Sequence, residues 1–323
     1  MGAHFSQFLP PKPAFTEANL PSLQGKVFLI TGGTSGIGFE LAKILFNNGV
    51  RVYITARTEM KAFEAIKAIK SSSPRAISDN DDNDNDSGPG YIDFILLNLD
   101  DLSSIKDSAN NFKAKESKID VIWNNAGNFT TSPRQCLKTR LLLPLLQAAS
   151  IGPNSQSPRV IWLSSQVAEF SSPPVGIIMQ ELENTPKDNV RNYVNSKVGN
   201  ICLSAEFARR YGSSDTGQNP GIISVSLNPG AAMTNLLRNA KWMRFFSSPL
   251  LHDPKSAAYT ELYAGLSDSI SLERNGCYVV PFGRIHESLG EGLLNAMRGI
   301  EEGGTGRAKE FWEFCEERTR EYL

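Results

Sequence analysis

The stretch Val27-Phe-Leu-Ile-Thr31-Gly-Gly-Thr-Ser-Gly36-Ile-Gly38 decides the fold of this chain. Residues 26–30 form a short apolar run that predicts a buried strand, and the amphipathic segment 36–48 predicts a helix directly after it. In such a turn, Gly32 permits a tight bend, Gly36 lets a pyrophosphate approach the backbone at the helix N-terminus, and Gly38 lets helix and strand pack closely. The strand, turn and helix together predict a nucleotide-binding site.

Strand and helix patterns then alternate along the rest of the chain. Further strands are predicted at 50–55, 92–98, 119–123, 160–164, 222–227 and 276–281, and further helices at 58–70, 102–115, 132–150, 191–211 and 254–266. This alternation is typical of a parallel sheet with helices on both faces. The expected fold is therefore α/β: a Rossmann-type doubly wound parallel sheet of about seven strands, in a single domain.

We expect three segments to stand outside this regular pattern. Residues 1–22 form an N-terminal arm ahead of the domain at 23–323. We expect this arm to be exposed to solvent. Residues 71–90 hold five aspartates and no aromatic side chain, so they predict a disordered acidic insertion. Residues 284–323 form a C-terminal extension that ends in a helix at 308–320, where Phe311 and Trp312 are expected to pack against the domain.

Composition excludes several classes of function. A net charge of −1 gives no basic field, so nucleic acid is not an expected partner. Four scattered cysteines and three histidines favour neither a metal site nor a disulfide framework. The chain has no apolar run long enough for a membrane span and no signal-peptide core, so a cytoplasmic location is expected. Gly2 and Ser6 do fit the pattern for N-myristoylation, which leaves reversible membrane attachment open.

The segment Tyr193-Val-Asn-Ser-Lys197 places a phenol and an ammonium group one helical turn apart, on the same helix face. Such a pair is common on helices and alone would say little. Here Ser164 and Ser165 end a preceding strand, and the nucleotide-binding turn lies upstream. The combination predicts a redox enzyme that uses a nicotinamide cofactor and a tyrosine acid/base.

The end of the second strand bears on the choice of cofactor. An acidic residue there would accept hydrogen bonds from the ribose 2′-hydroxyl of NAD. This chain has Thr55-Ala56-Arg57-Thr58 instead, and a guanidinium suits a 2′-phosphate. NADP(H) is therefore favoured over NAD(H), although Arg57 could also be an ordinary surface arginine.

Five motifs in their order resemble those of the short-chain dehydrogenase/reductase family. They are Thr31 to Gly38, Asn124-Asn125-Ala126-Gly127, Ser164-Ser165, Tyr193 with Lys197, and Asn228-Pro229-Gly230 with Thr234. The form Tyr-x-x-Ser-Lys-x-x-Asn and the long spacing from serine to tyrosine resemble the retinol-dehydrogenase-like branch. Leu9-Pro-Pro-Lys-Pro and the Phe311-Trp-Glu-Phe tail resemble its fungal members.

This resemblance implies a role for each matching residue. Tyr193 would be the general acid/base, Lys197 would lower its pKa and bind the cofactor ribose, and Ser165, favoured over Ser164, would hydrogen-bond the substrate oxygen. The implied cofactor-binding set is Thr31, Gly32, Ser35, Gly36, Ile37, Gly38, Arg57, Asn98, Asn125, Ala126, Gly127, Tyr193, Lys197, Pro229, Gly230 and Thr234.

The resemblance also implies a small-molecule substrate, and many members are dimers, so a homodimer is open. The loop segments 166–190 and 231–253 are rich in apolar side chains. They suit a lipophilic alcohol/carbonyl pair, with ordinary core packing as the alternative.

Two departures from the family pattern stand out. Asn98 occupies the position of the aspartate that reads the adenine, so weaker adenine contacts are expected. After Gly127 the chain lacks the front half of a long helix, and Thr131 aligns with the asparagine that anchors the proton-relay water to the lysine. Ser132 and Pro133 look like a helix start. The alternative function is therefore a catalytically impaired nucleotide-binding homologue.

Overall fold

The computed structural model describes residues 6–7, 9–73, 90–127, 132–151, 157–213, 221–231 and 252–323. Within these ranges, eight strands form one sheet in the order β3-β2-β1-β4-β5-β6-β7-β8. The strands are β1 (Val27–Ile30), β2 (Arg51–Ala56), β3 (Tyr91–Leu96), β4 (Val121–Asn124), β5 (Arg159–Leu163), β6 (Ile223–Leu227), β7 (Tyr278–Val280) and β8 (Arg284–Ile285). All neighbouring pairs are parallel except β7 and β8. The doubly wound parallel sheet is confirmed, with a short antiparallel strand added at one edge.

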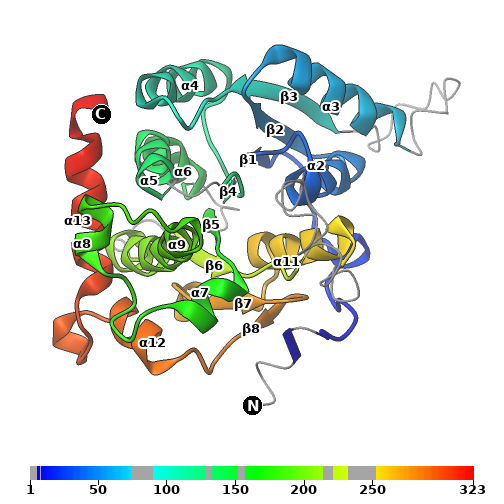
Figure 1. Ribbon diagram of the computed structural model, residues 1–323. Helices are drawn as coiled ribbons and strands as arrows, with labels where there is room; N and C mark the ends of the chain where they lie inside the picture. Colours follow the sequence, from blue (N-terminus) through cyan, green and yellow to red (C-terminus); the bar gives the residue numbers. More distant parts are fainter. Residues whose placement is uncertain are drawn as a thin grey trace, which may run out of the picture.

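Helices cover both faces of this sheet (Figure 1). They are α2 (Gly36–Asn47), α3 (Glu59–Ser71), α4 (Leu102–Lys115), α5 (Ser132–Leu141), α6 (Leu143–Ala149), α7 (Gln166–Ser171), α8 (Met179–Glu183), α9 (Asn189–Tyr211), α11 (Pro254–Leu266), α12 (Glu291–Met297) and α13 (Arg307–Thr319).

Alternation along the strands creates the two larger hydrophobic clusters of the described residues, one on each face of the sheet. In β4, Val121 and Trp123 pack with residues of α2, α3 and α11, whereas Ile122 packs with residues of α4, α5 and α9. Because successive side chains of a strand point to opposite faces, strands buried on both faces are apolar throughout, as the sequence predicted.

The single helix predicted at 132–150 is wrong, because the structure divides it into α5 and α6 around Leu142. Pro144 lies at the start of α6. Proline has no backbone N–H, and its ring clashes with the carbonyl of the preceding turn, so α5 cannot continue through it.

The N-terminal arm is not the solvated segment that was expected. Phe15 packs edge-on against Tyr263 of α11 with ring centroids 5.9 Å apart. Glu17 forms an ion pair of 2.8 Å with Lys255 on the same helix. Gln7 is only 2% exposed. The arm therefore packs against α11 and, through Ser6, against Arg284 of β8. Gly2 lies outside the described residues.

The C-terminal helix packs as predicted. Phe311, Trp312 and Cys315 of α13 are buried in the core that also holds residues of α5 and α9. Figure 1 shows α13 at one side of the molecule, next to α9.

Most of the predicted insertion at 71–90, namely residues 74–89, lies outside the described residues. Residue 71 ends α3, and Gly90 N donates to Phe46 O at 2.9 Å, so the regular structure resumes at Gly90. None of the helices in the described ranges is long and apolar enough to cross a membrane.

Candidate active site

The predicted motifs gather at the carboxyl edge of the sheet. The order of strands reverses between β1 and β4, and open α/β sheets bind ligands beside such a switch point, at the carboxyl ends of their strands. The glycine turn follows β1, the Asn-Ala-Gly loop follows β4, the two serines follow β5, and Asn228 follows β6. One edge therefore collects segments far apart in the sequence.

The glycine turn has the geometry that a bound pyrophosphate requires. Gly32 and Gly36 have φ values of 68° and 61°, a backbone region that favours glycine. A Cβ on Gly38 would lie 2.5 Å from Asn125 Nδ2 and 2.8 Å from Gly32 O, so no larger residue fits there. Ser35 precedes α2 and forms no capping bond with its side chain, whereas Ile37 is buried. The N-terminus of α2 thus presents backbone amides at the switch point.

Thr31 ties this turn to the loop after β4. Its backbone N–H and its hydroxyl both donate to Trp123 O, at 3.0 and 3.1 Å. Ala126 N donates to Thr31 Oγ1 at 2.9 Å, and Asn125 Nδ2 donates to Thr31 O at 2.8 Å. Gly127, the next residue, is exposed. These bonds hold the two sides of the expected cofactor cleft in fixed register.

Arg57 and Asn98 lie at the ends of β2 and β3. Arg57 is exposed, and no described residue forms an ion pair with it. Asn98 Oδ1 accepts a hydrogen bond from Asp100 N at 3.2 Å, so the acceptor expected to meet the adenine also holds its own turn.

The structure brings Ser165, Tyr193 and Lys197 together. Lys197 Nζ lies 5.6 Å from the centroid of the Tyr193 ring and donates to Leu163 O at 3.1 Å. A side-chain hydrogen bond joins Ser165 and Tyr193. Ser164 Oγ instead donates to Lys197 O at 2.8 Å, which anchors α9 to the end of β5. Of the two serines, Ser165 is the one beside the phenol.

Burial has the largest effect on the pKa values of both Tyr193 and Lys197. Burial raises the pKa of Tyr193, and the hydrogen bond with Ser165 opposes that rise; Lys197 is not among the causes. Burial also lowers the pKa of Lys197 to about 8, opposed by the charge of Glu261. In the free protein burial is the largest influence on the tyrosine pKa, and the role of Lys197 in lowering it stays a prediction.

Sequence reasoning missed Glu261, on the apolar helix α11. It is 1% exposed, and burial raises its pKa to about 8. A single acidic residue in a helix gives no sign that it faces the core.

Sequence reasoning also missed two residues of the shortened helix. Gln135 Nε2 donates to Ala126 O, and Lys138 Nζ donates to Asn124 Oδ1 at 2.6 Å. Both side chains are buried, and burial lowers the pKa of Lys138 to about 7. They dock α5 directly onto the Asn-Ala-Gly loop. Thr131 lies outside the described residues.

The loop after β6 carries Pro229 and Gly230. Gly230 has a φ of 90°, and its N–H donates to Asn228 Oδ1 at 2.9 Å. Thr234 lies outside the described residues, as do residues 232–251 of the predicted apolar loop.

Of the apolar side chains in 166–190, Ile177 is fully buried in the core, whereas Phe170 is 47% exposed. Ile177 therefore serves packing, whereas Phe170 is partly exposed to solvent.

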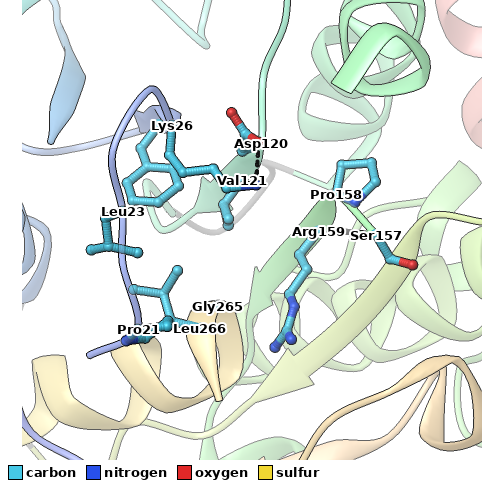
Figure 2. Close-up of a pocket in the computed structure, with 11 residues that line it drawn as sticks. Pro21, Leu23, Lys26, Asp120, Val121, Ser157, Pro158, Arg159, Gly265 and Leu266 are labelled. Atoms are coloured by element: carbon cyan, nitrogen blue, oxygen red, sulfur yellow. Dashed lines mark hydrogen bonds and ion pairs between the residues drawn. The ribbon is translucent and has the colours of Figure 1, made fainter. Parts of the chain in front are cut away.

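A cavity at the opposite edge of the sheet is not a comparable site. Figure 2 shows Lys26, Asp120 and Arg159 around it, at the amino-terminal ends of β1, β4 and β5. Its volume of about 20 Å³ suits one water molecule. The polar groups are already engaged, since Lys26 pairs with Asp120 at 2.9 Å and Arg159 donates to Ala264 O at 3.1 Å.

Comparison with known proteins agrees with this geometry. Residues 26–142 match the family model of the short chain dehydrogenases. A short-chain dehydrogenase/reductase of the fungus Phomopsis amygdali is 37% identical over 341 residues, covering 99% of this chain and 97% of that protein. That alignment is longer than the 323 residues of this chain, so the relative carries residues without a counterpart here.

Two solved structures share the fold at lower identity. A short-chain dehydrogenase of Shigella flexneri in complex with NADP has a TM-score of 0.57 and 18% identity, over 80% of this chain and 97% of that one. A 3-ketoacyl-(acyl-carrier-protein) reductase of Brucella melitensis in complex with NADH has a TM-score of 0.57 and 20% identity. The match covers 80% of this chain and 96% of that one.

The comparisons do not favour a catalytically impaired homologue, and assignment to the retinol-dehydrogenase-like branch stays a prediction. The full-length similarity to a fungal relative, the matching family model and the Rossmann-type sheet agree with one another. The chain therefore belongs to the short-chain dehydrogenase/reductase family and is an NAD(P)-dependent oxidoreductase.

Proposed function

We propose that this enzyme uses NADP(H) to interconvert an alcohol and an aldehyde or ketone on a lipophilic small molecule. The observation that carries the proposal is the convergence of Ser165, Tyr193 and Lys197 at the carboxyl edge, beside the glycine turn. A phenol, an ammonium and a hydroxyl at that place suit proton transfer to a substrate oxygen.

The glycine turn fits a dinucleotide. Positive φ at Gly32 and Gly36, the lack of space for a side chain at Gly38, and the open N-terminus of α2 all suit a pyrophosphate against the backbone. When bound, the nicotinamide would supply or accept the hydride. Lys197 would hold the ribose near it.

Tyr193 would exchange the proton. Its raised pKa keeps the phenol protonated near neutral pH, so in the reducing direction it is ready to donate to the carbonyl oxygen. Ser165 would hydrogen-bond the same oxygen and orient it. Lys197, when protonated, would stabilise the phenolate that remains.

Two observations support the finer assignments. Arg57 is exposed at the end of β2, where no acidic residue competes for a ribose hydroxyl, and this favours the 2′-phosphate of NADP(H). The exposed Phe170 on α7 and the apolar composition of the loops favour a lipophilic substrate. A homodimer stays a prediction.

The test is a titration of the purified protein with NADPH and NADH by fluorescence, followed by assays of NADPH consumption. The assays use a panel of lipophilic aldehydes and ketones. We expect tighter binding of NADPH and a fall in its absorbance with at least one carbonyl compound. Tight binding without turnover across the panel would reject the proposed activity, and equal affinities would reject the NADP(H) preference.

A further inference from the structure

Gln7 of the N-terminal arm lies in a buried polar network at the candidate site. Gln7 is 2% exposed, although it stands 221 residues from its hydrogen-bond partner Asn228. Asn228 is also buried, and the side chains of Glu169 and His286 are 1% and 5% exposed. A glutamine on an arm ahead of the first strand has no packing reason to be buried among polar groups, so its bonds require an explanation.

The hydrogen bonds form a directed chain. Gly230 N donates to Asn228 Oδ1 at 2.9 Å, and Asn228 Nδ2 donates to Gln7 Oε1 at 2.9 Å. Gln7 Nε2 then donates to Glu169 Oε2 at 2.8 Å. His286 Nε2 lies 2.9 Å from the other oxygen of Glu169. Gln7 is the link between the loop after β6 and helix α7.

Only an amide fits this link. The side chain of Gln7 accepts at one end and donates at the other. A glutamate at this position would place a second carboxylate against Glu169, and an apolar side chain would leave Asn228 and Glu169 with buried unpaired groups.

The arm is also held in place next to this link. Arg284 of β8 donates through Nη2 to Ser6 O at 2.9 Å and through Nη1 to Ser6 Oγ at 3.1 Å. Strand β8, which the sequence did not predict, therefore anchors the arm at Ser6. Gln7 is presented from a fixed backbone.

The two elements that Gln7 joins both carry candidate site residues. Ser165 is the N-cap of α7, and Glu169 lies one turn further along that helix. Asn228 fixes Gly230 at the start of the loop expected to meet the nicotinamide. A shift of either element changes the distance between this loop and the serine hydroxyl.

We propose that Gln7 is a positioning residue that ties the nicotinamide-side loop at 228–230 to helix α7. Gln7 itself touches neither substrate nor cofactor; it acts through Asn228 and Glu169. The role rests on the proposed function, because it assumes that the loop meets a nicotinamide.

The test compares five proteins: the parent, Gln7→Met, Gln7→Glu, the exchange Gln7→Glu with Glu169→Gln, and Gln147→Glu as a control at an exposed position of α6. The exchange keeps the net charge. It also lets the new amide at position 169 donate to the new carboxylate at position 7, so the chain of bonds can form again. Each protein is titrated with NADPH and with 2′,5′-ADP, which lacks the nicotinamide, and each is melted without ligand.

We expect both single changes at Gln7 to weaken NADPH binding about tenfold or more and to leave the affinity for 2′,5′-ADP within about twofold. The exchange should recover most of the NADPH affinity and of the melting temperature, and Gln147→Glu should match the parent. An equal loss of affinity for NADPH and for 2′,5′-ADP would mean that Gln7 has only a general structural role. Unchanged NADPH affinity, or an exchange no better than Gln7→Glu, would overturn the proposal.

The same set separates this inference from the proposed function. If the parent binds neither ligand, the proposed function fails. The melting temperatures of the parent, the Gln7→Glu protein and the exchange then still decide whether Gln7 and Glu169 are coupled. If Gln7→Met does not fold, Gln7→Glu and the exchange provide the same comparison.

Discussion

Tyr193 differs from phenylalanine by one oxygen atom. In the structure the side chain of Tyr193 shares a hydrogen bond with that of Ser165. Tyr193→Phe should therefore keep the shape of the site and remove only the proton donor. We expect turnover to fall by about 10²–10⁴-fold, the usual contribution of a general acid/base. NADPH affinity, measured by fluorescence titration, should change by less than about twofold. A large loss of affinity would instead assign Tyr193 to the structure of the cofactor site.

Arg57 offers a charge test of cofactor choice. Arg57→Asp would turn attraction for a 2′-phosphate into repulsion, while an aspartate can accept bonds from a ribose hydroxyl. The ratio of the NADH to the NADPH dissociation constant should fall by about tenfold or more. Lys67→Asp, on the exposed side of the following helix α3, makes the same change in charge and should leave the ratio alone. An unaltered ratio in the Arg57 variant would remove the 2′-phosphate assignment.

Lys138 makes the stability of the protein depend on pH. Burial lowers its pKa from 10.5 to about 7 in the folded state. Between those values the unfolded chain holds a proton that the native state lacks, so this group makes the free energy of unfolding rise with pH, by up to about 1.4 kcal/mol per unit.

The stability of Lys138→Met relative to the parent should therefore be highest near pH 6 and should fall toward pH 10. Urea denaturation at pH 6, 8 and 10 gives the difference directly, and the contributions of Lys197 and Glu261 cancel in it. Lys113→Met, at an exposed position of α4, should show no such trend. A difference that is constant with pH would contradict the buried, neutral lysine.

At the scale of the element, α13 stabilises the fold through Trp312. Its ring is fully buried, with centroids 6.1 Å from Phe207 and 6.3 Å from Tyr211, both on α9. Trp312→Ala should lower the free energy of unfolding by about 3–5 kcal/mol, since it leaves a large cavity between two helices. Lys309→Ala, on the exposed side of α13, should cost less than about 0.5 kcal/mol. Chemical denaturation measures both, and equal small losses would mean that α13 is not coupled to the core.

The elements differ in how well the sequence predicts them. Helices α4 and α11 have the bounds that periodicity and caps predict, because Asp101 and Asp253 accept backbone bonds at their starts. Strands buried on both faces show as apolar runs. The two-residue strand β8 and helices α7 and α8 are too short to carry a period, so only tertiary contacts define them.

The same contrast holds for the candidate site. Its motif residues lie within a few positions of a strand end, so local sequence places them at the carboxyl edge. Gln7, Glu169, Lys138 and Glu261 become polar core residues only through partners distant in the sequence. The spacing of residues along the sequence does not predict these contacts.

For the whole molecule, a bound cofactor should raise the melting temperature. The glycine turn, the loops after β4 and β6, and α9 all meet at one edge, so a ligand there joins both halves of the sheet. NADPH at 100 times its dissociation constant should add about 2.7 kcal/mol, or roughly 4 °C for a chain of 323 residues. Differential scanning fluorimetry with NADPH and with NADH at the same concentration measures this. The smaller shift should belong to NADH, and the reverse order would contradict the preference.

The docking of Ser6 and Gln7 also sets an order of events during synthesis on the ribosome. Ser6 is translated first among these groups, yet its partner Arg284 follows 278 residues later. At roughly 5–20 residues per second, the arm waits roughly 14–56 s before it can dock. The loop at 228–230 gains its last support only when nearly all of the sheet has been made, so nascent and truncated chains should bind the cofactor poorly.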